Sequence, residues 1–243
     1  MIKFFRHIRQ RMIKENRVSK YLLYAIGEIV LVVIGILIAL QLNNWNGEQK
    51  RSKQEIELLV EMRENLSSDL ADCRYNIGMN EKLLLGNEMV LKHLTERTPF
   101  HDSLRVHYAQ LFGGTQQTAN TSAFDNLKSI GFDLIQNDSL RRNITTLYSE
   151  RYTYLHSQEV DMMVKMQMDN LEDVIHGKVV VEALWQSAYP LDDSALMDDE
   201  VFKSVVRLNV IMFKFMIGIY TSVEGRIGGL IEQIDKELED RQP

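Results

Sequence analysis

The sequence predicts an all-α protein, in which a single N-terminal transmembrane helix continues into an up-down helical bundle. Residues 21–42 form an almost uninterrupted apolar stretch, which as a helix is long enough to cross a bilayer core. Beyond it, apolar residues recur at helical spacing, and none of the three prolines interrupts a long periodic segment. We therefore expect three parts: a leader over residues 1–20, a transmembrane helix over 21–45 and a bundle domain over 46–243.

The leader is strongly basic, since it carries only one acidic residue. Its seven basic residues are Lys3, Arg6, Arg9, Arg11, Lys14, Arg17 and Lys20. Because basic residues next to a span stay in the cytoplasm, the N-terminus is predicted inside and the bundle outside. The apolar residues of the leader share one helical face, which favours a helix lying on an anionic membrane surface. A disordered basic segment is the alternative, and it would also bind anionic lipid.

The apolar stretch is predicted to be an uncleaved signal anchor, because it is too long for a signal-peptide core and no small-x-small cleavage site follows. An ionised carboxylate near the middle of a bilayer costs at least about 2.5 kcal/mol, so Glu28 should face protein or water. Gly35 and Ala39 lie on the same side as Glu28, and small residues four apart let helices approach closely. We predict that these three residues form a packing face for a second copy or for another membrane protein. A protonated Glu28 that hydrogen bonds across the interface is favoured over an ion-coupling carboxylate, since a neutral acid needs no ion pathway.

The first external helix is predicted from Glu48 to about His93, in continuation of the span. Its apolar residues recur in two seven-residue series, but Arg63 and Asn80 interrupt them, so a bundle helix is favoured over a strict coiled coil. Cys73 is the only cysteine and lies on the apolar seam. We expect it to be a small buried residue, with an intermolecular disulfide as the alternative.

Four more helices are predicted beyond it, over residues 103–112, 123–130, 140–175 and 200–239. Gly113 and Gly131 should end the first two, and Asn137 or Asp138 should begin the third. A loop is expected over 188–193.

The last predicted helix is apolar nearly all round. The stretch Val205–Val223 is long enough for a second span, but it contains Arg207, Asn209 and Lys214. Because each central charge costs about 2.5–3.5 kcal/mol in a membrane, we expect instead a helix buried at the centre of the bundle.

Two strings carry a family resemblance: YAIGEIVLVVIGILIALQLNNWN in the span and TSAFDNLKSIGFDLIQNDSLRRNITTLY in the bundle. Together with the basic leader, they resemble an uncharacterised family of single-pass membrane proteins from Bacteroidota. The resemblance implies an inner-membrane protein of a Gram-negative cell, with residues 46–243 in the periplasm. The family has no assigned activity, so it implies no catalytic residue.

The bundle shows no catalytic, cofactor-binding or metal-binding motif. Residues 43–243 hold 21 basic and 32 acidic groups, which argues against nucleic acid because phosphate binding needs a basic face. A glycine-rich phosphate loop, a zinc-protease helix, a nucleophile elbow and paired Glu-x-x-His sequences are all missing. His156 with Glu159, and Asp173 with His176, have ligand spacing, but neither pair recurs on a second helix. We therefore expect no cofactor, and these pairs are interpreted as surface residues.

Three neighbouring methionines, Met162, Met163 and Met166, share one side of the third long helix. Core filling is favoured over a site for cuprous copper.

Three functions follow as hypotheses. The first is a non-enzymatic, membrane-anchored interaction or adaptor module that binds other envelope proteins through its span and bundle. The second is a subunit of an ion-driven envelope machine that uses Glu28. The third is a periplasmic sensor of an unnamed small molecule, which would need another protein for its output.

Overall fold

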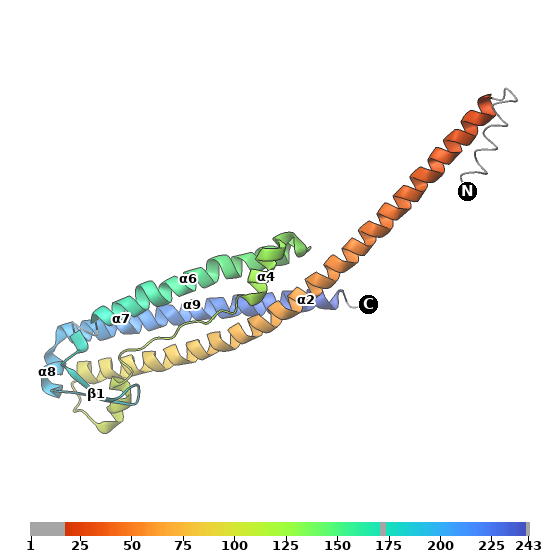
Figure 1. Cartoon of the computed structure of the whole chain (residues 1–243). Helices are drawn as coiled ribbons and strands as arrows, with labels where there is room; N and C mark the ends of the chain where they lie inside the picture. The colour runs from red at the N-terminus through yellow and green to blue at the C-terminus, as the bar shows by residue number, and fades with distance from the viewer. Residues whose placement is uncertain (1–17, 171–173, 242–243) are drawn as a thin grey trace. The chain divides into compact units, whose positions relative to one another are not determined.

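The computed structural model describes residues 18–170 and 174–241, with side chains from Leu22 onward (Figure 1). The chain divides into two compact units, Met1–Glu55 and Ile56–Pro243. Helix α2 (Val18–Glu96) contains this boundary. About 81% of the described residues are helical, and a long apolar N-terminal helix continues into a helical region, which confirms the predicted all-α class.

Three long helical segments build the second unit: α2 after residue 55, a segment over 138–170, and α9 (Glu200–Glu239). Figure 1 shows α9 beside α6, and α9 contacts both α5 and α6. Helices α2 and α9 are antiparallel, because Arg74 Nε donates to Glu224 Oε1 at 2.7 Å and Lys214 Nζ lies 2.7 Å from Glu88 Oε1. The bounds of α9 are those predicted.

Two hydrophobic clusters lie among these segments, one along most of the bundle and one near the start of α9. Buried residues of α9 recur at alternating steps of four and three, as an amphipathic helix requires. They include Phe202, Val206, Asn209, Phe213, Met216 and Tyr220.

The segment over 138–170 consists of alternating α-helical and π-helical stretches. They are α5 (Asp138–Thr146), η3 (Leu147–Arg151), α6 (Tyr152–Ser157), η4 (Gln158–Val164) and α7 (Lys165–Asn170). Asn137 caps the segment as predicted, because its Oδ1 accepts from the N–H groups of Ser139 and Leu140 at 3.0 and 3.1 Å. The π-helical stretches η3 and η4 were not predicted.

Short elements connect α2 to α5: η1 (Asp102–Leu104), α3 (Arg105–Tyr108), α4 (Ser122–Ile130) and η2 (Phe132–Leu134). The predicted stop of α4 at Gly131 is confirmed, with φ of 118°. The predicted helix over 103–112 is too long, since α3 ends at Tyr108. Just after Tyr108, the Asn87 side chain donates to the Gln110 carbonyl and the Asn209 side chain donates to the Leu111 carbonyl. These bonds draw the chain out of the helical path.

A β-hairpin and a short helix precede α9, where the sequence predicted only a loop. Strand β1 (Val179–Ala183) pairs antiparallel with β2 (Ser187–Pro190), and α8 (Asp193–Asp198) follows. Three consecutive valines begin β1, and β-branched residues favour strands. This local preference was overlooked because the surrounding pattern is helical.

Candidate functional site

The residues predicted to pack in the membrane lie along the first part of α2. Glu28, Gly35 and Ala39 are all exposed there. Within the described residues, α2 is the one helix long and apolar enough to cross a membrane. A Cβ added at Gly35 would have no neighbour within 4 Å, so this side of the helix is open to a close partner. Of the basic leader, Lys20 lies in the first turn of α2, and the other six basic residues lie outside the described residues.

A row of polar side chains on α2 holds an extended segment, residues 110–122, which we call the strap. The row is Asn65, Asp69, Asp72, Asn76, Asn80 and Asn87. Its hydrogen-bonded pairs with the strap are Asn87–Gln110, Asn80–Thr115, Asn76–Gln116, Asp72–Thr118, Asp69–Asn120 and Asn65–Ser122, at 2.8–3.3 Å. The strap therefore runs antiparallel to α2. The bonds to Gln110, Gln116, Thr118 and Asn120 satisfy backbone polar groups of the strap, where a sheet or helix is lacking.

Sequence reasoning missed this row. Asn80 was interpreted as an interruption of an apolar series, whereas it is buried and bonded to the strap. The signal was present, because the six residues share one helical face at steps of three, four and seven.

Two acids of the bundle are almost completely buried beside the strap. Asp69, 1% exposed, accepts from Tyr152 Oη at 2.7 Å and from the Asn120 N–H at 2.8 Å. Glu159, 2% exposed, accepts from Tyr220 Oη and, at 2.8 Å, from the Gln117 N–H. Burial raises the pKa of both carboxyl groups, because desolvation disfavours the charged form. The interpretation of Glu159 as a surface residue is therefore wrong.

The π-helical stretches explain how Tyr152 and Glu159, on the segment over 138–170, both reach the core. Buried residues recur at four-residue steps, as Leu140, Ile144, Tyr148 and Tyr152, and again as Leu155, Glu159 and Met163. Such a row would drift around an α-helix, whereas the wider π turns keep it facing α2 and α9. Met163 fills the core and Met166 packs against it, which agrees with the predicted core role of the methionines.

The raised pKa values give a testable pH dependence. The folded-state pKa values of Asp69 and Glu159 lie above their ordinary values of 3.8 and 4.5. At a pH between the ordinary pKa and the folded-state pKa, the folded state therefore binds more protons than the unfolded state. Their contribution to stability is present below the ordinary pKa and is lost as pH rises through the folded pKa. We expect Glu159→Gln, which still accepts hydrogen bonds, to gain stability relative to wild type as pH rises from about 5 to about 8. Denaturant unfolding at several pH values measures the difference in the free energy of unfolding between the variant and wild type. Titration of the other groups, which the two proteins share, cancels in this difference. A difference that is constant or falls with pH would contradict the assignment.

A separate group of three polar side chains, Tyr108, His93 and Asp193, lies at the hydrophobic cluster near the start of α9. Tyr108 Oη lies 2.9 Å from His93 Nδ1, and His93 Nε2 lies 3.3 Å from Asp193 Oδ1. Burial lowers the pKa of His93, so a neutral ring that accepts from Tyr108 and faces Asp193 suits this arrangement. Asp193 also accepts from the Phe100 N–H at 3.0 Å. These contacts of Asp193 tie α8 to the residues that follow α2.

Neither the buried acids beside the strap nor the group of Tyr108, His93 and Asp193 has the composition of a metal centre. The described residues contain no group of three or more histidine, cysteine, aspartate or glutamate side chains that could hold a metal ion. Cys73 is buried, as predicted, and its Sγ donates to the Tyr220 carbonyl. Burial raises the pKa of its thiol to about 12, so it is a poor nucleophile.

Helix α9 presents an exposed face, which corrects the prediction that it lies buried at the centre of the bundle. We call this face the outer face, and it ends at the half-buried Gly229: Val201, Ser204, Leu208, Ile211, Phe215, Gly218, Ser222, Gly225 and Gly229. Its four large side chains are 61%, 38%, 62% and 42% exposed, in chain order. Two polar residues of the same helix, Lys203 and Asn209, are buried instead. Polar contacts within the bundle, such as that of Asn209 with the strap, leave apolar residues outside.

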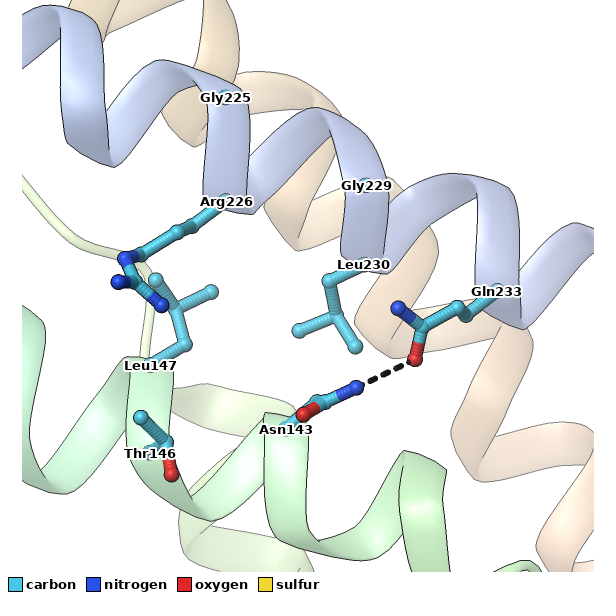
Figure 2. Close-up of a pocket in the computed structure, with 8 residues that line it drawn as sticks. All are labelled: Asn143, Thr146, Leu147, Gly225, Arg226, Gly229, Leu230 and Gln233. Carbon is cyan, nitrogen blue, oxygen red and sulfur yellow. Dashed lines mark hydrogen bonds between the residues drawn. The ribbon is translucent and has the colours of Figure 1, made fainter.

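A pocket of about 240 Å³ lies at the glycine-rich end of the outer face, between α5 and α9. Figure 2 shows Arg226, Leu230 and Gln233 reaching from α9 toward Leu147 and Asn143. Asn143 Nδ2 donates to Gln233 Oε1 at 2.7 Å at one side of the pocket. Gly225 and Gly229 belong to the lining, and a Cβ at either would have no neighbour within 4 Å. The pocket is therefore open space that side chains of α9 do not fill.

A family model described as a family of unknown function, DUF6090, matches residues 28–174, more than half of the chain. The chain belongs to this family. No curated protein and no solved structure matches it. The DUF6090 match begins at Glu28 and includes the strap with both buried acids, Asp69 and Glu159, whereas α9 lies beyond it.

Proposed function

We propose that this DUF6090 chain is a membrane-anchored interaction module of the envelope, without enzymatic activity. In this proposal α2 spans the inner membrane of a Bacteroidota cell from residue 21 to 45. The basic leader is cytoplasmic and residues 46–243 are periplasmic. The apolar, exposed first part of α2 supports the span, and the seven basic residues before it support the orientation.

The observation that supports binding most directly is the outer face of α9. Large apolar side chains gathered on one face of a bundle helix mark an interaction surface more often than chance exposure does. Within the membrane, Glu28, Gly35 and Ala39 offer a second contact for another membrane helix. Binding of envelope proteins through span and bundle uses both surfaces.

Crosslinking in intact membranes followed by affinity purification of the full chain tests the proposal. Stable partners, or a second copy, should be recovered in mild detergent. Recovery of the monomer alone, after crosslinking as well as before, would contradict the proposal.

Glu28→Gln separates the interaction module from an ion-driven machine. Glutamine keeps hydrogen bonding but cannot release a proton, so we expect complex formation and cell phenotype to be unchanged. Ala39→Leu, which removes the small residue, serves as the comparison and should weaken packing in the span. Normal complexes with a lost phenotype in Glu28→Gln would instead favour the ion-driven hypothesis. A thermal shift of the full chain by a small molecule would favour the sensor hypothesis.

A further inference from the structure

The pocket between α5 and α9 contains an arginine whose charge is not neutralised. Among the described residues, Arg226 is the one basic side chain of α9 before Gly229 that has no ion pair. The basic side chains that precede it on α9 all pair with acids: Lys203, Arg207 and Lys214. A guanidinium group presents its N–H donors in a fixed fork that matches a carboxylate. Arg226 therefore offers donors to a carboxylate that the described part of the chain does not supply.

A second arginine adds positive charge at this level of the bundle. The Nε atom of Arg151 is buried and has no hydrogen-bond partner among the described residues. Arg151 follows the pocket residue Leu147 by four positions, so it lies on the same side of its segment. The hydrogen bonds of this segment advance along one helix as they recede along α9. Arg151 and Arg226 therefore lie at about the same level, which favours an anion there.

The rest of the pocket suits the stem of an acidic side chain. Its floor is apolar, since Leu147 and Leu230 are each 2% exposed. Figure 2 shows the Arg226 guanidinium beside Leu147, at one end of this floor. Gly225 and Gly229 carry no side chain, so another backbone can come close. The volume of about 240 Å³ exceeds that of an apolar cavity of about 150 Å³ that holds benzene, so one long side chain fits.

The pocket continues the apolar part of the outer face. Arg226 follows Phe215 by eleven residues, or about three turns, so the two side chains lie on one side of α9 and about 16 Å apart along its axis. Ile211 precedes Phe215 by one turn on this side. Gly218 and Ser222 lie between Phe215 and Arg226, where they leave α9 without large side chains. A helix laid along this side meets apolar side chains, then small residues and then a guanidinium group.

We propose that this side of α9 binds an amphipathic helix of another envelope protein, and that an aspartate or glutamate of this helix binds Arg226 in the pocket. This inference rests on the proposed function, and it names the chemistry of the partner. Apolar side chains of the partner cover Ile211 and Phe215, and its acid lies about 16 Å farther along the helix. The carboxylate neutralises the charge of Arg226 and is held in a fixed geometry.

A second copy of the chain does not fit this surface. Two parallel α9 helices would place Arg226 against Arg226, and like charges oppose such a contact. Two antiparallel α9 helices would also set the two α2 helices antiparallel, because α2 and α9 run side by side in each chain. The two chains could then not both be anchored in one membrane through α2. The acid therefore comes from a different protein.

Photocrosslinking of the full chain in its own membrane tests the proposal. A photocrosslinking amino acid at position 233, in the pocket lining, should give a product with the same partner as one at position 215. Arg226→Glu should lower the yield of both products by more than about tenfold, and Arg226→Lys should lower it less. Lys82→Glu makes the same change of charge and should leave both yields unchanged, because Lys82 is exposed on α2 and does not line the pocket.

The crosslinked peptide identifies the acid. Mass spectrometry of the product from position 233 should find an aspartate or glutamate within about one helical turn of the crosslinked residue. Replacement of this acid by arginine in the partner should lower the yield, and its combination with Arg226→Glu should restore the yield. Helical content by circular dichroism checks that each variant is folded.

Three results would overturn the inference and leave the proposed function standing. They are products from position 215 that do not respond to Arg226→Glu, a crosslinked peptide without an acid, and a product of twice the chain mass from position 233. The last would show that the partner is a second copy. The absence of products from both positions would contradict the inference and the proposed function together.

Discussion

Gly86→Ala is expected to destabilise the bundle, whereas Gly78→Ala, two turns earlier on α2, should stabilise it. A Cβ at Gly86 would lie 2.5 Å from Gln110 Cβ and 3.2 Å from the His107 carbonyl oxygen. Side chains in a packed protein do not approach so closely, so the strap would have to move away from α2. We expect the free energy of unfolding to fall by about 1–3 kcal/mol.

Gly78 provides the matched control. A Cβ there would have no neighbour within 4 Å, and alanine favours the helix by about 0.5–1 kcal/mol over glycine. Denaturant unfolding of both variants measures the two changes. Equal changes in the two variants would show that the strap does not rest against Gly86.

The second large effect is expected for Asn209→Leu. Asn209 is 2% exposed, and its Nδ2 donates to the Leu111 carbonyl at 2.8 Å and to Asn87 Oδ1 at 3.1 Å. Leucine would leave both acceptors buried without a donor, at a cost of about 1–3 kcal/mol for each. The free energy of unfolding should therefore fall by about 2–6 kcal/mol.

Gln233→Leu is the control for this effect. Gln233 also takes part in an inter-helix hydrogen bond, with Asn143, but both side chains are exposed to water. Its replacement should change the free energy of unfolding by no more than about 0.5 kcal/mol. If Asn209→Leu were as mild, the hydrogen bonds of Asn209 would not anchor the strap to α9.

Local signals in the sequence predicted the helices well where one residue decides the boundary. Gly131 ends α4 and Asn137 begins α5, because a left-handed φ and a side-chain cap depend on those residues alone. The bounds of α9 followed from a long apolar period, and the Asp199 side chain caps its start. Such features are local, so they can be inferred without knowing what packs against the helix.

Features that depend on tertiary contacts could not be inferred in the same way. Asn80 breaks an apolar period in the sequence, and its role becomes clear only when the strap lies beside it. Similarly, the nearly complete apolar circumference of α9 predicted a helix at the centre of the bundle, whereas two neighbouring segments and the strap leave Ile211 and Phe215 exposed. Excess apolar surface on a bundle helix is evidence for a partner outside the chain.

The proposed role of this DUF6090 chain requires that the outer face of α9 meets protein in the native membrane. A photocrosslinking amino acid at position 215 of the full chain, expressed in its own membrane, tests this contact directly. Position 154 is the matched control, because Phe215 and Tyr154 are both aromatic and are 42% and 48% exposed. We predict protein crosslinks from position 215 and none from position 154, with a product of twice the chain mass if the partner is a second copy. No product from position 215, or equal products from both positions, would contradict the proposed function.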